Sequence, residues 1–241
     1  MPFNMAFDKK MMLAEASTNL PPKDALSKLG YILFPTDIAP READVLRDTI
    51  FKAGQAGARC LLDDPGVRDI VIKLREQLSD AALMRASAVA VQAIAFDKNP
   101  DANWKVSWHQ DLIFPFASQP NKRGFDLPSK KDGVDYARPP MEVLEELLAV
   151  RFHLDDCGET NGPLRVAPGS HRHGILRSTE IPDYVARYGE TKCLANTGDA
   201  LLLKPLLLHA SSPAINPQHR RVLHLVYCSG EAISEKWYRS I

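Results

Sequence analysis

The chain of 241 residues carries 30 basic and 30 acidic side chains, so its net charge of zero provides no overall field that favours a nucleic acid or a membrane surface. No segment approaches the roughly 20 consecutive apolar residues that span a bilayer, and no apolar stretch follows the N-terminal lysines as in a secretory signal. The four cysteines lack Cys-x-x-Cys spacing, which argues against a zinc knuckle or a thioredoxin-like motif. We therefore expect a cytoplasmic protein with reduced cysteines, whose partner is a small molecule rather than a nucleic acid or a membrane.

The N-terminal part of the chain combines an irregular lead-in with a first strand and a first helix. Residues 1–25 show little periodicity and predict an N-terminal arm, which leaves residues 26–241 as a single domain. The apolar residues 31–34 predict a short buried strand. Pro40 opens a helical pattern, and Gly54 lies where that helix should stop. Its apolar face consists of Ala43, Leu46 and Ile50.

A second helix has a clearer beginning. Asp64 is an expected N-cap, and Pro65 fits the first turn. Apolar residues then follow at helical spacing, namely Val67, Ile70, Val71, Leu74 and Leu78. We expect both helices to pack against a sheet.

From residue 88 onward the pattern changes to short apolar segments broken by turn residues, which is typical of an antiparallel β domain. The predicted strands are residues 88–96, 104–111, 147–154, 164–167, 200–203, 206–211 and 221–228. Helices come first and strands follow, so we predict an α+β, mainly β fold rather than an alternating Rossmann arrangement.

Residues 117–140 are rich in Pro, Gly, Ser, Lys and Asp. A loop of this length inside a compact domain is usually functional or disordered. We predict a lid that faces the substrate, with a plain solvated loop as the alternative. Its basic side chains are candidate anion contacts: Lys122, Arg123, Lys130, Lys131 and Arg138.

A candidate metal site begins in the run Trp108-His109-Gln110-Asp111. If this run is a strand, His109 and Asp111 project from the same face and can bind one ion. His209, far downstream, is a candidate third ligand. Two histidines and one carboxylate leave open coordination positions on Fe(II), as non-haem iron oxygenases require, whereas a structural metal site would tend to close its shell.

Residues downstream of His209 suit a co-substrate with two carboxylates, such as 2-oxoglutarate. Its keto-acid end would chelate the iron, and its far carboxylate would need a cation, which Arg220 or Arg221 can supply through a planar guanidinium. Adjacent strand residues face opposite sides, so only one of these arginines can enter the pocket. Ser211 points the same way as His209 and can donate its hydroxyl to that carboxylate.

At these residues the chain resembles the Fe(II)- and 2-oxoglutarate-dependent phytanoyl-CoA dioxygenases, over roughly residues 26–230. The matching pieces are residues 109–111, the turn segment Asn161-Gly-Pro-Leu-Arg-Val-Ala-Pro-Gly-Ser-His171, and residues 209–211 followed by Arg220. The resemblance implies a double-stranded β-helix, a cupin-like jelly roll whose open end holds the iron. It also implies that His109, Asp111 and His209 bind iron, that Arg220 rather than Arg221 binds 2-oxoglutarate, and that Gln110 contacts this co-substrate, as in some members.

The strand predicted over residues 147–154 places Arg151 and His153 on one face. The resembling enzymes often have an aromatic residue near the position of Arg151. This departure suggests a second cation for 2-oxoglutarate or for an acidic substrate, with a surface salt bridge as the alternative. The remaining histidines are not needed for the metal, and His171 is expected to hold its turn: they are His171, His173, His219 and His224.

The function expected from this resemblance is a dioxygenase that uses Fe(II), 2-oxoglutarate and O2, with ascorbate as a stimulant. It would hydroxylate an aliphatic carbon of a small molecule and release succinate and CO2. Asp111 excludes the related halogenases, in which a small residue replaces the carboxylate ligand. The alternatives are a non-catalytic cupin-like binding module and an isomerase or hydrolase that uses zinc, manganese or nickel in the same fold. The sequence predicts neither the substrate nor an oligomeric state.

Overall fold

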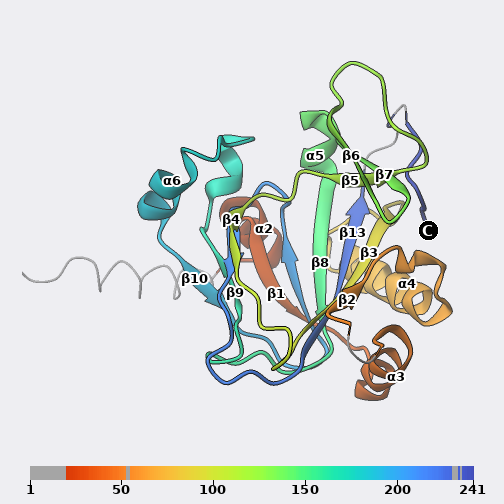
Figure 1. Ribbon diagram of the computed structural model, residues 1–241, viewed down its shortest axis with the longest axis vertical. Coiled ribbons are helices and arrows are strands. Elements are labelled where there is room, and N and C mark those ends of the chain that lie inside the picture. The colour runs from red at the N-terminus through yellow and green to blue at the C-terminus, as the bar shows by residue number, and fades with distance from the viewer. Residues whose placement is uncertain (1–19, 53–54, 230–232, 234) are drawn as a thin grey trace, which may run out of the picture.

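A computed structural model describes residues 20–52, 55–229, 233 and 235–241. Its centre is a six-stranded antiparallel sheet that faces a four-stranded antiparallel sheet (Figure 1). The large sheet runs in the order β1 (Tyr31–Pro35), β11 (Asp199–Leu203), β8 (Leu147–His153), β13 (Arg220–Cys228), β3 (Val89–Lys98) and β2 (Gly57–Ala58). The small sheet runs β10 (Thr191–Cys193), β9 (Leu164–Val166), β12 (His209–Ser211) and β4 (Val106–His109).

The two faces of the large sheet have different neighbours. One face packs under three N-terminal helices, α2 (Pro22–Leu29), α3 (Pro40–Ile50) and α4 (Pro65–Asp80), in one hydrophobic cluster, so the predicted packing of helices against a sheet is confirmed. The other face packs against the small sheet in a second cluster. On β13 the residues alternate between these clusters, with Leu223 and Leu225 under the helices and Val226 towards the small sheet.

Helix α4 begins as predicted, because Asp64 Oδ1 accepts a hydrogen bond of 3.0 Å from the backbone N–H of Val67. Helix α3 begins at Pro40 and ends at Ile50, and the expected stop at Gly54 lies outside the described residues. The remaining helices are α5 (Met141–Glu146), α6 (Ile181–Tyr188) and the 3-10 turns η1 (Leu61–Asp63) and η2 (Ser170–His173). None of the helices in these described ranges has the length and hydrophobicity to span a lipid bilayer.

The prediction of an irregular arm up to residue 25 is wrong at its C-terminal end. Helix α2 already starts at Pro22 and buries Ala25 and Leu26 under the large sheet. Eight residues with two buried positions give too weak a period to be recognised, since such a short helix depends on tertiary packing. Residues 1–19 lie outside the described parts of the chain.

The segment 117–140, predicted as a loop that forms a lid, is not an irregular loop, and its role as a lid stays a prediction. This segment contains the hairpin of β6 (Asp126–Lys131) and β7 (Val134–Arg138), which pairs with β5 (Phe114–Phe116) in a third sheet. Asp132 and Gly133 join the two strands with φ values of 50° and 79°, as a two-residue hairpin turn requires. Asp126, Lys130 and Lys131 on β6 are exposed, which explains why composition alone suggested a loop.

Two predicted strands are shorter in the structure. Strand β4 ends at His109, and the N–H of Asp111 then donates to the carbonyl of Pro205 at 2.9 Å. Strand β12 starts at His209, because residues 204–207 form a turn closed by Leu207 N–H and Lys204 C=O. The end of β4 and the start of β12 lie at the same end of the small sheet, because the two strands are antiparallel neighbours. The two chain reversals therefore shape the candidate site.

Candidate metal centre

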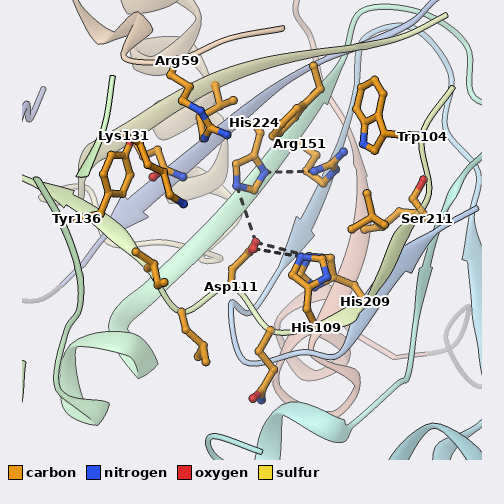
Figure 2. A pocket seen from close by; sticks show the side chains of 18 of the residues that line it. Arg59, Trp104, His109, Asp111, Lys131, Tyr136, Arg151, His209, Ser211 and His224 are labelled. Atoms are coloured by element: carbon orange, nitrogen blue, oxygen red, sulfur yellow. Dashed lines mark hydrogen bonds and ion pairs between the residues drawn. The ribbon is translucent and has the colours of Figure 1, made fainter. Parts of the chain in front are cut away.

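Three side chains converge at the end of the small sheet. His109 closes β4, His209 opens β12, and the two are register partners, with ring centroids 4.2 Å apart. Asp111 faces both: its Oδ1 lies 3.6 Å from His109 Nε2 and its Oδ2 lies 3.6 Å from His209 Nε2 (Figure 2). One potential ligand atom from each residue lies within 4.8 Å of the others, so a single cation can contact all three. The structure thus brings together the three residues that the sequence singled out.

Backbone carbonyls orient both imidazoles for metal binding. His109 Nδ1 lies 2.8 Å from the carbonyl of Ser107, and His209 Nδ1 lies 2.9 Å from the carbonyl of Leu207. In each case the nitrogen that donates to the carbonyl must carry the proton, which leaves the lone pair on Nε2. Such a second hydrogen bond commonly fixes the tautomer and orientation of histidines that bind metals.

The protonation states of His209 and Asp111 also suit a divalent cation, whereas the hydrogen bond and charge of Asp111 raise the pKa of His109 despite its burial. Burial lowers the pKa of His209 to about 4, so this ring is neutral at pH 7. Burial alone would raise the pKa of Asp111, but the neighbouring His209 and His109 hold it well below its usual range. A neutral imidazole and an ionised carboxylate are the forms that coordinate a metal.

The triad lies in the wall of a cavity of about 420 Å³, a size typical of small-molecule sites. Figure 2 shows that the labelled side chains occupy two regions on either side of Asp111 and His224. We call one region the inner lobe, which is lined by Trp104, Arg151, Ser211 and Arg220. We call the other the outer lobe, which contains Arg59, Lys131 and Tyr136. Gln92 belongs to it, because Gln92 and Tyr136 together also line a small adjacent cavity.

The inner lobe is strongly cationic. Arg220 begins β13, Arg151 lies in the middle of β8, and Lys98 ends β3 as the register partner of Arg220. All three side chains are buried, and Nε of each arginine has no hydrogen-bond partner within the described residues. Burial, together with the charge of Arg220, lowers the pKa of Lys98 to about 8. Against these cations the adjacent Asp111 supplies one negative charge, so the lobe suits an anionic ligand.

The two adjacent arginines face opposite ways. Arg221 forms a bidentate ion pair with Asp155, with Nε to Oδ2 at 2.8 Å and Nη2 to Oδ1 at 2.9 Å. Arg220 instead lines the cavity beside Ser211. The hydroxyl of Ser211 accepts a hydrogen bond of 2.8 Å from Lys98 Nζ and lies 3.2 Å from the carbonyl of Gly162.

Gln110 has a different role from the co-substrate contact expected for it. Its Nε2 donates to the carbonyls of Gly174 and Leu206 at 2.8 and 2.7 Å, and its Oε1 accepts from the N–H of Leu176 at 2.9 Å. Both amide protons are therefore used, although the side chain borders the cavity. Gln110 joins the loop after η2 to the turn before β12, and we no longer expect it to bind a ligand.

Arg151 does not form the surface salt bridge considered as its alternative, because it is buried. Its Nη1 lies 3.5 Å from Nδ1 of His224, whose Nε2 is 4.0 Å from Asp111 Oδ2. His224 was set aside in the sequence, yet it separates the triad from Arg151. Side chains alternate along β13, so His224 lies on the same face as Arg220. This spacing in the sequence could have indicated that His224 lines the site.

The other expected contacts fall in two groups. His171 Nε2 lies 3.1 Å from the carbonyl of Ser27 in α2, which agrees with a structural role. Among the basic residues of the segment 117–140, Lys131 lines the cavity, whereas Lys130 and Arg138 pair with acidic residues of their own hairpin. Lys98 and Gln92 were not recognised in the sequence, because their importance depends on which strands flank β3.

The chain is similar to known proteins in sequence and in fold. Residues 30–222 match the sequence profile of phytanoyl-CoA dioxygenase (PhyH). The L-proline trans-4-hydroxylase of Streptomyces griseoviridis is 27% identical over 146 residues, which are 50% of this chain and 47% of that enzyme. The chain thus spans about half the length of this curated relative.

Solved structures agree on the fold. The non-heme alpha ketoglutarate dependent carbocyclase SnoK from nogalamycin biosynthesis superposes with a TM-score of 0.63 at 15% identity, covering 88% of this chain and 85% of that one. EctD from S. alaskensis with bound Fe gives 0.61 at 20% identity, covering 91% and 82%. The predicted mainly β jelly roll is therefore confirmed. Since the profile match over residues 30–222 covers well over half of the chain, the chain belongs to the phytanoyl-CoA dioxygenase (PhyH) family.

Proposed function

We propose that this protein is an Fe(II)- and 2-oxoglutarate-dependent oxygenase that hydroxylates an aliphatic carbon of a small molecule and releases succinate and CO2. The observation that carries the proposal is the position of the His109, Asp111 and His209 triad beside a lobe with buried, unpartnered guanidinium nitrogens. The similarity to L-proline trans-4-hydroxylase over half of the chain supports the same reaction class.

The donor set of the triad fits iron. Two imidazole nitrogens and one carboxylate oxygen are the ligands of non-haem Fe(II) oxygenases, which keep further positions open. Bound iron would supply the activation of O2, coupled to the oxidative decarboxylation of 2-oxoglutarate. His109 and Asp111 are partly exposed towards the cavity, at 39% and 28% of their side chains, whereas His209 is buried at 4%. The accessible side of the site is therefore the side of the cavity.

The inner lobe provides the binding energy and the orientation for 2-oxoglutarate. Arg220 can form a two-point contact with the distal carboxylate, and Arg151 adds a second cation nearer to Asp111. Lys98 Nζ donates a hydrogen bond to the hydroxyl of Ser211, and Ser211 lines the lobe. The positive charge of Lys98 therefore lies next to the lobe. A dianion compensates the buried positive charge that Asp111 leaves unbalanced, which is a reason for these residues to occur together.

The walls of the cavity separate the reacting groups from water. Trp104, Phe96 and Leu164 line it with apolar surface, and Lys98 Nζ lies 5.5 Å from the Trp104 ring centroid. A dry, preorganised lining strengthens each electrostatic contact and limits side reactions of an oxidising centre. The hairpin of β6 and β7 contributes Leu127, Lys131 and Tyr136 to the same wall, and we propose that it covers the substrate.

A direct test measures succinate formation by the anaerobically purified protein supplied with Fe(II), 2-oxoglutarate, O2 and ascorbate, with and without a panel of small metabolites. We expect succinate release that depends on iron and increases with an accepted substrate. The variant Asp111→Ala should lose this activity at least 100-fold, because it removes the anionic ligand. Binding of 2-oxoglutarate without any succinate release would instead identify a non-catalytic binding module, and full activity with zinc, nickel or manganese would exclude the iron assignment.

A further inference from the structure

The outer lobe of the cavity is not needed for iron or for 2-oxoglutarate, yet it is chemically specialised. It combines two cations, Arg59 and Lys131, with the carboxamide of Gln92 and the hydroxyl of Tyr136. Figure 2 shows Arg59, Lys131 and Tyr136 together on the side of His224 that is opposite to Trp104 and Ser211. Arg59 follows β2, Gln92 lies on β3, and Lys131 and Tyr136 lie on the two strands of the β6–β7 hairpin, so the fold assembles them around the cavity.

Gln92 is the strongest indication of a ligand. Its side chain is 8% exposed, it lines the cavity, and its Oε1 is buried without a hydrogen-bond partner within the described residues. A buried carbonyl oxygen that lacks a donor carries a penalty, which an N–H or O–H group of a bound molecule can relieve. On β3, Gln92 shares its face with Ile94 and Phe96, which line the same cavity.

The two cations are available for an anion. Lys131 forms no ion pair within the part of the chain that the structure describes, and its Nζ lies 5.2 Å from the centroid of the Tyr136 ring. Arg59 has one acidic neighbour, since its Nε is 3.9 Å from Oδ2 of Asp132. Asp132 is 76% exposed at the hairpin turn, so water screens this pair strongly.

Backbone strain gathers around the same lobe. Four described residues other than glycine have positive φ. The hairpin turn requires that of Asp132, and two of the others adjoin the lobe, Cys60 at 59° and Leu127 at 48°. Cys60 follows Arg59, and Leu127 lines the cavity. Such conformations are tolerated where the surrounding structure needs a particular side-chain direction.

We propose that the outer lobe binds the carboxylate of a small aliphatic substrate through Arg59 and Lys131, while Oε1 of Gln92 accepts a hydrogen bond from an N–H or O–H group of the same substrate. This inference rests on the proposed oxygenase function and specifies its substrate class. The cavity of about 420 Å³ must also hold 2-oxoglutarate, which favours a compact acid. The body of the substrate would contact the apolar lining, namely Ile94, Leu112, Ile113 and Leu127, and the carbon to be hydroxylated would then lie between the anchored carboxylate and the triad.

The test compares carboxylic acids of up to about eight carbons, including amino, imino and hydroxy acids, with their primary amides and with octanoyl-CoA. Stimulation of succinate release is measured for each probe. We expect at least one acid to stimulate release with a half-saturation at least 10-fold lower than that of its amide. Amides that match their acids, stimulation by octanoyl-CoA alone, or no stimulation by any acid while substrate-free succinate release proceeds would each overturn the proposal. If no succinate forms under any condition, the proposed oxygenase function itself has failed.

Variants locate the anchor. The double substitution Arg59→Gln and Lys131→Gln should raise the half-saturation for the acid at least 10-fold, and that for 2-oxoglutarate much less. Lys130→Gln is the matched control, because Lys130 neighbours Lys131 but pairs with Asp135 outside the cavity. Equal effects of the double substitution and of Lys130→Gln would overturn the assignment. Melting temperatures close to that of the unmodified protein would show that each variant is folded.

Discussion

Arg220 and Arg221 are neighbours in the sequence with opposite surroundings, and this pair allows a sharp test of the co-substrate site. Arg220→Met removes a guanidinium that is 3% exposed in the inner lobe and has an unpartnered Nε. We expect its loss to remove two charge-assisted hydrogen bonds to 2-oxoglutarate, each worth about 1.5–3 kcal/mol. Because Arg151 and Lys98 remain, the net effect should be about 3 kcal/mol, or roughly 100-fold in Kd.

The free energy of unfolding should respond in the opposite sense. Arg220→Met removes a buried cation without an ion pair in the described structure, so the ligand-free protein should be as stable as before or more stable. Arg221→Met breaks the bidentate pair with Asp155, whose side chain is 16% exposed and keeps a longer contact of 3.6 Å to Arg47. This partly buried pair should contribute about 1–2 kcal/mol, so Arg221→Met should destabilise the protein while leaving the Kd for 2-oxoglutarate within about threefold.

The assay is anaerobic titration calorimetry with 2-oxoglutarate on the Fe(II) protein, combined with urea unfolding of the ligand-free protein. Arg220→Lys serves as an intermediate, since it keeps the charge but loses the planar fork, and should weaken binding by about tenfold. The reasoning is refuted if Arg221→Met weakens 2-oxoglutarate binding as strongly as Arg220→Met is expected to, or if Arg220→Met leaves the affinity unchanged.

Three further perturbations test the metal site and its support. Fe(II) at about 100 times its Kd should raise the free energy of unfolding by about 2.7 kcal/mol, and Asp111→Ala should abolish this increase in anaerobic melts. Gln110→Ala loses three hydrogen bonds to backbone groups and should lower the free energy of unfolding by about 3 kcal/mol. A change in 2-oxoglutarate affinity without a change in the free energy of unfolding would contradict the structural role of Gln110. Because the pKa of Lys98 is lowered to about 8 and a bound anion would raise it, 2-oxoglutarate affinity should fall as the pH rises above 8, and titrations of Lys98→Met should lack this dependence.

Local sequence signals predicted the parts of the fold that depend on a few neighbouring residues. Asp64 and Pro65 marked the start of α4 because capping involves a backbone N–H three residues away. The strands β8 and β13 were recognised because both are continuously buried and apolar apart from their few polar positions. The Asp132-Gly133 turn carried an equally local signal for the hairpin, but the charged residues around it masked the strands.

The support of the site depends on strand pairing that one sequence does not encode locally. Lys98 lies beside Arg220, and His224 beside Arg151, because β13 runs between β3 and β8 in a particular register. A shift of one residue would turn each of these side chains to the opposite face of the sheet. The sequence predicted that His109 and Asp111 project from one face of a strand. In the structure β4 ends at His109, and a hydrogen bond from the N–H of Asp111 to the carbonyl of Pro205 positions Asp111 instead.

The inner lobe combines features that a structural core avoids. Burial and, after it, the charge of Arg220 lower the pKa of Arg151 to about 10, so the two guanidinium groups destabilise one another in the ligand-free protein. A residue kept for stability would lower both stability and affinity when removed. Removal of Arg151 or Arg220 should instead raise stability and lower affinity for a dianion, because the penalty is relieved when the ligand binds. Opposite signs for the two quantities would therefore identify these arginines as ligand-binding residues, independently of any measured turnover.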